Sequence, residues 1–297
     1  MCSDVSREED SLEETAPNET VLHEIWVRFR RSKLGMVGAV GVILLTSIAV
    51  LAPLLAPYNP LAVDLDSQFL PPCARHPFGT DLYGRDVMSR VLYGSRISLS
   101  IGLLPSLLSL IIGTTLGVLS GYYGKWIDTA IMRLADIVLA FPSMLLAMVI
   151  MYTLGASLVN IFIALSVVSW AGTARVVRAQ TLSLKEQEFV QAAKAIGVGD
   201  LTIIRRHILP NCFAALVVIL TMGIPSAIMS EAGLSFLGIG AQPPTPSWGL
   251  MITQSEEYLF TAPWNAVFPG LAILLTVLAF NFLGDGLRDA LDPFMKR

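Results

Sequence analysis

Ser183-Leu-Lys-Glu-Gln-Glu-Phe-Val-Gln-Ala-Ala-Lys-Ala-Ile-Gly197, with its continuation to Pro210, is the longest charged passage in the second half of an otherwise apolar chain. Ser183 and Glu186 have the spacing of a capping box, which predicts that a helix begins at Ser183. Gly197 is placed to end that helix in a left-handed conformation after about three to four turns. The charges and the glycine indicate a water-exposed helix between two apolar segments.

A second short helix is expected over residues 201–209. Asp200 can cap its amino-terminal end, and Pro210 can stop it where the next apolar run begins. The middle of the first helix, Gln191-Ala192-Ala193, carries two side chains of one carbon each, which let another protein surface approach the backbone closely. We therefore predict a helix-turn-helix elbow that docks against a partner. The alternative is a helical hairpin that contacts no other protein.

The composition is that of an integral membrane protein. Hydrophobic residues make up 54% of the 297 residues and charged residues only 14%, and the mean hydropathy is +0.65. A soluble domain carries about 25% charged residues. The net charge of −3 combines an acidic tail with basic loops, so it says nothing about nucleic acid. Three scattered cysteines argue against a disulfide framework. Cys73-Ala-Arg-His76 has the spacing of half a metal site, but no second pair of ligands lies nearby, so no metal site is expected.

Long apolar runs predict six membrane spans. A span needs about 20 apolar residues. Such runs occupy residues 34–57, 97–124, 212–240 and 265–284, and residues 137–174 accommodate two spans joined at Gly155-Ala-Ser157. Four cations in Trp26-Val-Arg-Phe-Arg-Arg-Ser-Lys33 precede the first span, and positive flanking charge stays in the cytoplasm. Both termini are therefore expected inside, the first after an acidic tail in residues 1–20.

Two features inside the spans concern helix packing. Small residues recur every four positions along the second span, which predicts a ridge where another backbone can pack closely: Ser109, Gly113, Gly117 and Gly121. Lys125, Asp128 and Arg133 are expected to mark a short turn before a third span that begins near Asp136. Because Arg133 and Asp136 are three residues apart on one helical face, a local ion pair between them is predicted.

Glu231 is the ionisable residue that stands out within a predicted span. It lies in the fifth apolar run, which Pro225 is expected to interrupt. A carboxylate at that depth must face protein or water, and is by default a functional candidate. A place on the substrate path and a structural pairing remain equally open.

The chain divides into three expected parts. Residues 1–33 form the acidic tail and basic anchor, residues 34–96 the first span and an external loop, and residues 97–297 a five-span core that includes the elbow, residues 179–211. The external loop contains Arg85, Arg90 and Arg96, whose carboxylate partners are expected to be Asp81 and Asp86. This loop is interpreted either as a salt-bridged cap or as part of a docking surface for an extracytoplasmic binding protein.

The elbow carries a family resemblance. The spacing of Gln191-Ala-Ala193, Gly197 and His207-Ile-Leu209-Pro210 resembles the Glu-Ala-Ala loop of the membrane subunits of ATP-binding-cassette importers, although Gln191 stands where Glu is usual and His207 where Ile is usual. The segment from His76 through Arg90, with Gly94-Ser-Arg-Ile-Ser-Leu99, resembles the dipeptide, oligopeptide and nickel branch of these permeases. The resemblance runs from about residue 28 to the end. It implies an all-α polytopic fold with six transmembrane helices, the type I importer transmembrane domain.

The resemblance also implies partners and site residues. Two ATPase subunits, a second permease and an extracytoplasmic binding protein would complete a machine in the bacterial cytoplasmic membrane. Short peptides are the expected cargo, with nickel chelates and glutathione as alternatives. Coupling to the ATPase is expected to use eight residues of the elbow: Glu188, Gln191, Ala192, Ala193, Gly197, Asp200, Leu209 and Pro210.

Other functional classes have little support in the sequence. Gly124-Lys125 lacks the earlier glycine of a phosphate-binding loop and is followed by Trp126, so ATP and magnesium are expected on the partners and no cofactor in this chain. Gly233-Leu-Ser235 does not complete a nucleophile elbow, which argues against a membrane enzyme. A secondary transporter is the remaining rival, although such proteins often carry several intramembrane carboxylates.

Overall fold

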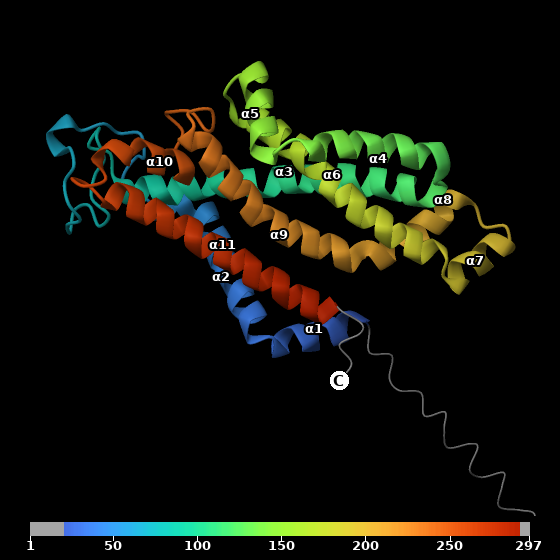
Figure 1. The fold of residues 1–297 in the computed structure, drawn as a ribbon. Helices are drawn as coiled ribbons and strands as arrows, with labels where there is room; N and C mark the ends of the chain where they lie inside the picture. The colour runs from blue at the N-terminus through green and yellow to red at the C-terminus, as the bar shows by residue number, and fades with distance from the viewer. Residues whose placement is uncertain (1–20, 292–297) are drawn as a thin grey trace, which may run out of the picture.

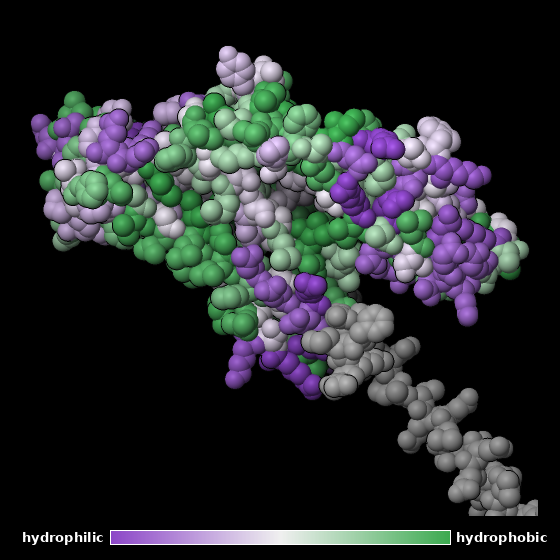
Figure 2. Space-filling model, in the orientation of Figure 1, coloured by the Kyte–Doolittle hydropathy of each residue, from purple (hydrophilic) through white to green (hydrophobic). Residues whose placement is uncertain are grey.

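The computed structural model describes residues 21–291, and within that range it is built of helices and loops. Figure 1 shows long helices that connect two ends of the molecule. We call the end formed by residues 56–86 and 237–263 the cap end, and the end formed by residues 186–203 the elbow end. Figure 2 shows hydrophilic residues gathered at these ends and apolar side chains between them, as expected for a chain in a bilayer. The acidic tail, residues 1–20, lies outside the described residues.

The predicted number of spans is confirmed. Five helical segments are long and apolar enough to cross a membrane: α2 (Lys33–Leu55), α3 (Val87–Tyr123), α6 (Leu158–Lys185), the continuous segment Asp200–Phe236, and α11 (Trp264–Leu291). The sixth span is a pair, α4 (Lys125–Ala140) and α5 (Ser143–Leu154), bent by 92° at Phe141-Pro142. A further helix, α1 (Val21–Arg31), precedes α2. The predicted link at Gly155-Ala-Ser157 is also confirmed, because Ser157 caps α6 and Gly155 has φ +87°.

Helix α3 begins ten residues before the predicted span. The Asp86 side chain caps it by accepting the backbone N–H of Ser89 at 2.7 Å. Arg90 and Arg96 therefore belong to α3 and not to a loop, and the expected boundary at residue 96 falls inside the helix. The sequence analysis began the span after Arg96 because the preceding residues carry charges. In the structure one of them, Arg90, is buried in the helix near the Asp81 carboxylate, 3.5 Å away.

The predicted small-residue ridge packs α3 against α6. A Cβ atom built at Gly113 would lie 2.6 Å from the Thr173 Cβ, and one at Gly117 would lie 2.6 Å from the Ala174 carbonyl oxygen. Both distances are far below van der Waals contact. Gly121 meets Thr181 in the same way, at 2.8 Å. The ridge prediction is confirmed, and it fixes α6 so that its last turn reaches the elbow end (Figure 1).

Ion pairs join α4 to α6, and they differ from the predicted ones. Asp136 pairs with Arg175 at 2.5 Å and not with Arg133, and Asp128 accepts two bonds from Arg178. The third span does not begin near Asp136, because α4 starts at Lys125 directly after the positive-φ Gly124. Partners from a neighbouring helix replace the local pair because α4 and α6 pack along their lengths.

The cap end is held together by a buried tryptophan. Helix α10 (Trp248–Gln254) begins after a proline-rich loop, with Ser247 as its cap. The Trp248 ring donates to the Val91 carbonyl at 3.0 Å, and its backbone N–H donates to Ser98 at 3.1 Å, so α10 is fixed on α3. Two short 3-10 helices, η1 (Leu65–Ser67) and η3 (Glu256–Tyr258), complete this end.

The charged side chains of the cap pair in part as predicted. Asp81 is the partner of Arg85, at 2.7 Å, and the nearer carboxylate to Arg90. Asp86 pairs instead with the His76 ring at 2.9 Å, so its predicted arginine partner is wrong. Arg85 and Arg90 approach Asp81 and not Asp86, because the Asp86 carboxylate caps the amino-terminal end of α3.

Candidate functional site

The first elbow helix is shorter than predicted. Helix α6 continues through Ser183 to Lys185, and α7 (Glu188–Ala195) begins after a turn at residues 186–187. The capping box at Ser183 is therefore wrong, and α7 has about two turns. Tertiary packing decides this, because Leu184 lies against the buried cluster of the elbow and keeps α6 helical for another turn.

Gly197 ends α7 as predicted. Its φ is +82°, a conformation that favours glycine. Its N–H donates to the Lys194 carbonyl at 3.0 Å, and the N–H of Val198 donates to the Ala193 carbonyl at 3.1 Å. This is the hydrogen-bond pattern of a glycine-terminated helix.

Asp200 does not cap the second elbow helix. It is the first residue of α8 (Asp200–Ile203), whose cap position is Gly199. Its carboxylate accepts a bond of 2.7 Å from the Tyr122 hydroxyl, and the Lys194 ammonium lies 5.0 Å from the centre of the Tyr122 ring. Tyr122 thus ties both elbow helices to the end of α3, a role that the sequence analysis did not find.

The proline after α8 does not stop the helix. A π-helical turn, η2 (Ile204–Ile208), connects α8 to α9 (Leu209–Phe236), and Leu209 donates to the carbonyl of Ile204, five residues back. Pro210 lies in the first turn of α9, where its missing N–H is tolerated. The predicted stop at Pro210 is therefore wrong, as is the predicted interruption by Pro225, which is buried inside α9.

The two adjacent alanines of α7 face opposite ways. Ala193 is buried with Val190 against Ile203 and Ile208, whereas Ala192 is exposed. Glu188 and Gln191 are also exposed, and the Gln191 amide donates to the Lys185 carbonyl at 2.8 Å. Only one of the two small side chains is thus available to a partner, and Ala193 serves the packing of the elbow itself.

The exposed side of α7 is apolar along one line. Phe189, Ala192 and Ile196 follow each other at spacings of three and four, and so share a face, which we call the elbow face. Phe189 is 43% exposed and Ile196 is 80% exposed, although the surrounding surface is charged. An exposed apolar line in a charged surface is typical of an interaction site. The spacing of Phe189 and Ile196 was the sequence signal for this face, and it was missed.

Comparison with known proteins identifies the chain. Residues 113–297 match the family described as binding-protein-dependent transport system inner membrane component, and residues 20–72 match the N-terminal membrane domain of oligopeptide transport permease C. The chain belongs to this family of importer permeases. It is 46% identical to the dipeptide transport system permease protein DppC of Alkalihalophilus pseudofirmus over 273 residues, which is 92% of this chain and 90% of the relative. It is also 49% identical to the glutathione transport system permease protein GsiD of Escherichia coli, over 93% of this chain and 92% of the relative.

A solved structure supports the fold of the permease. A chain of the MetNI methionine ABC transporter in an inward-facing conformation aligns with a TM-score of 0.57 at 20% identity, and the match covers 69% of this chain and 98% of that one. The predicted all-α fold, a type I ABC importer transmembrane domain, is confirmed. The chain is thus a multi-pass membrane permease of an ABC importer.

Within the permease, Glu231 is enclosed by its own chain. Its side chain accepts bonds from the Ser235 hydroxyl at 2.7 Å and the Ser247 hydroxyl at 3.0 Å, and the residue is only 1% exposed. Ser247 is the residue that caps the start of α10, so these bonds join the end of α9 to the start of α10. The contacts favour the structural pairing, with serines and not a cation as partners. The substrate-path role of Glu231 stays a prediction.

A second polar region lies between α3, α6 and α9 of the permease. A recess of about 210 Å³ is lined by apolar side chains and by six residues with hydroxyl groups, and we call it the serine recess: Ser106, Ser109, Ser169, Thr173, Ser226 and Ser230. Ser169, Ser226 and Ser230 are exposed in helices that are otherwise apolar. Serine and threonine are enriched where membrane helices pack against other protein.

Proposed function

We propose that this permease forms, with a second permease, the path by which short peptides enter the cell. An extracytoplasmic binding protein would deliver the cargo, and two ATPase subunits would drive the cycle. Two relatives that the chain matches over more than nine tenths of its length are named for dipeptide and for glutathione transport, and glutathione is itself a short peptide. Nickel chelates are the alternative cargo.

The elbow face is the observation that carries the coupling role. It presents Phe189, Ala192 and Ile196 outside the long apolar helices, on a segment fixed to α3 through Tyr122. A groove on an ATPase subunit would receive this line of apolar side chains. ATP and magnesium would be bound by that partner, since Lys125 in this chain is the first residue of α4 and not part of a phosphate-binding loop.

The serine recess supports the proposal that the peptide path runs along α3, α6 and α9. Its hydroxyls can exchange hydrogen bonds with the amide groups of a passing peptide, and their bonds to backbone carbonyls, such as Ser230 to Ser226 at 2.8 Å, leave lone pairs free to accept. The second permease would cover this face. Polar groups that are weak partners suit a path, because a cargo that binds tightly would not leave.

The elbow end is proposed to lie in the cytoplasm, together with both termini. Cations gather there, with Arg178, Arg205 and Arg206 close to the elbow. In a chain whose Cys2 and Cys73 are serine, a membrane-impermeant maleimide should label Phe260→Cys in intact cells, because Phe260 is 99% exposed at the cap end. Leu201→Cys, at a position of the elbow end that is 65% exposed and outside the elbow face, should react only after permeabilisation. Labelling of Leu201→Cys in intact cells would reverse the orientation.

Reconstituted uptake tests the function. Proteoliposomes containing the permease pair, the ATPase subunits and the binding protein should accumulate labelled dialanine only with internal ATP. Uptake of glutathione and of a nickel chelate, measured in parallel, tests the alternative cargoes. Accumulation by this permease without the ATPase subunits would instead establish a secondary transporter.

A further inference from the structure

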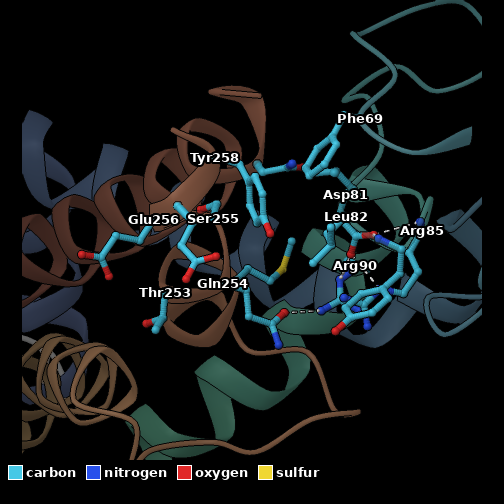
Figure 3. A pocket seen from close by; sticks show the side chains of 15 residues that line it. Phe69, Asp81, Leu82, Arg85, Arg90, Thr253, Gln254, Ser255, Glu256 and Tyr258 are labelled. Atoms are coloured by element: carbon cyan, nitrogen blue, oxygen red, sulfur yellow. Dashed lines mark hydrogen bonds and ion pairs between the residues drawn. The ribbon is translucent and has the colours of Figure 1, made fainter. Parts of the chain in front are cut away.

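The cap end contains a cavity that neither the coupling role nor the path uses. It has a volume of about 390 Å³ and lies between the loop before α3, the start of α3, and the α10–η3 segment (Figure 3). Small-molecule sites occupy about 300–1,000 Å³. Figure 3 shows the two arginines of the cap, Arg85 and Arg90, on one side of the cavity and Glu256 on the other.

Arg90 is a buried cation whose ion pair and hydrogen bonds are all long. Its residue is 2% exposed, yet its three polar contacts are long: 3.5 Å to Asp81, 3.4 Å to the Pro60 carbonyl and 3.4 Å to the Gln254 side-chain oxygen. A buried charge is stable only when paired and hydrogen-bonded at short distance. The guanidinium therefore lacks a carboxylate at short hydrogen-bond distance.

Asp81 does not supply that anion, because it is already engaged. Its Oδ2 accepts the Arg85 Nε at 2.7 Å, and its Oδ1 accepts the backbone N–H groups of Tyr83 and Arg85 at 2.9 and 3.0 Å. Two guanidinium groups thus share one carboxylate. The floor of the cavity carries an excess positive charge that suits a carboxylate ligand.

A second buried group at the cavity lacks a donor. Asn265, at the start of α11, is 6% exposed, and its Oδ1 has no hydrogen-bond partner among residues 21–291. Unpartnered buried acceptors are rare and costly. The rim adds the exposed carboxylates of Glu256 and Glu257, and the rings of Phe69 and Tyr258 stand 4.8 Å apart beside them. The cavity therefore accepts a negative group on its floor and donors or positive groups above it.

We propose that this cavity is a reception site for a free short peptide at the outer face of the permease. The carboxylate of the peptide pairs with Arg90, an amide N–H meets Asn265, and the ammonium group faces the rim carboxylates. An acidic side chain of the binding protein would satisfy Arg90 alone, whereas a zwitterionic peptide satisfies all three groups. The proposal rests on the proposed function for the cargo and adds a binding site within this chain.

Gln254 offers a direct test, since its side-chain oxygen already approaches Arg90. Gln254→Glu places a carboxylate of the chain itself beside the guanidinium, in the position assigned to the peptide carboxylate. The variant should keep or raise the melting temperature, because Arg90 gains a close partner, and should compete with the ligand. Arg90→Gln is less informative, because it removes a buried cation and endangers folding.

The experiment measures binding without transport. The assembled importer, in lipid nanodiscs and without its binding protein, is titrated with dialanine and with N-acetyl-dialanine amide, which has neither charge. The parental complex should bind dialanine and not the capped peptide, and Gln254→Glu should weaken dialanine binding at least tenfold. Gln242→Glu, which adds the same charge at an exposed position of the cap end, should leave that affinity unchanged.

Two results overturn the proposal. One is the absence of dialanine binding by the parental complex. The other is equal dialanine affinity of the parental and Gln254→Glu complexes. If the binding protein, added back afterwards, then attaches more weakly to the Gln254→Glu complex, the cavity serves protein docking. Since binding is measured directly, these outcomes stand apart from the uptake assay, whose failure would count against the proposed function.

Discussion

Ala192→Arg is expected to abolish co-purification of the ATPase subunits and peptide uptake while the chain inserts normally. Ala192 is exposed between Phe189 and Ile196 on the elbow face, so a long cation there blocks a partner from closing on the helix. A freely solvated surface would accept the change within about 0.5 kcal/mol. Pull-down of the ATPase from detergent extracts, together with the melting temperature of the permease, measures both effects.

The neighbouring position is the matched control. Ala193→Arg introduces the same side chain into the buried cluster with Val190 and Ile203, where an unpaired cation is strongly unfavourable. It should lower the melting temperature and the abundance of the chain, so its loss of uptake reports folding. Parental uptake and ATPase retention by Ala192→Arg would show that the elbow face is not the coupling surface.

This contrast between neighbours also shows what the sequence could not decide. Which alanine faces inward depends on where α7 begins, and the predicted start at Ser183 differs from the observed start at Glu188. The local pattern of Ser183 and Glu186 was consistent with a cap, but the packing of Leu184 kept α6 helical beyond it. Tertiary contacts overrode the local capping signal, because local propensities are weak compared with tertiary packing.

Features that depend on local chemistry were predicted well. The spans follow from the length of apolar runs, the end of α7 from the glycine at 197, and the close-packing ridge of α3 from the four-residue spacing of small side chains. Contacts between distant segments were not predicted. Tyr122 and Asp200 are 78 residues apart, and the groups around the cap cavity come from separate loops and helices. No local pattern connects them.

The second large effect is expected from the ion pair that joins α4 to α6 near the elbow. Arg178 donates to both oxygens of Asp128, at 2.5 and 2.6 Å, and the Ser120 hydroxyl of α3 donates to the same carboxylate at 2.5 Å. Arg178→Met leaves this half-buried carboxylate without its cation. Charged hydrogen bonds contribute about 1.5–3 kcal/mol each, so the loss should lower the melting temperature clearly and remove ATP-dependent uptake.

Exchanging the two charges distinguishes loss of the ion pair from other effects of removing Arg178. Asp128→Arg combined with Arg178→Asp restores opposite charges between α4 and α6, so it should recover part of the melting temperature that either single variant loses. Arg205→Met removes an exposed cation next to the elbow end, and its free energy of unfolding should stay within about 0.5 kcal/mol of the parental value. If the double variant melts no higher than the worse single variant, the two side chains do not act as a pair. The link between α4 and α6 would then rest on the pair of Asp136 with Arg175 and on apolar contacts.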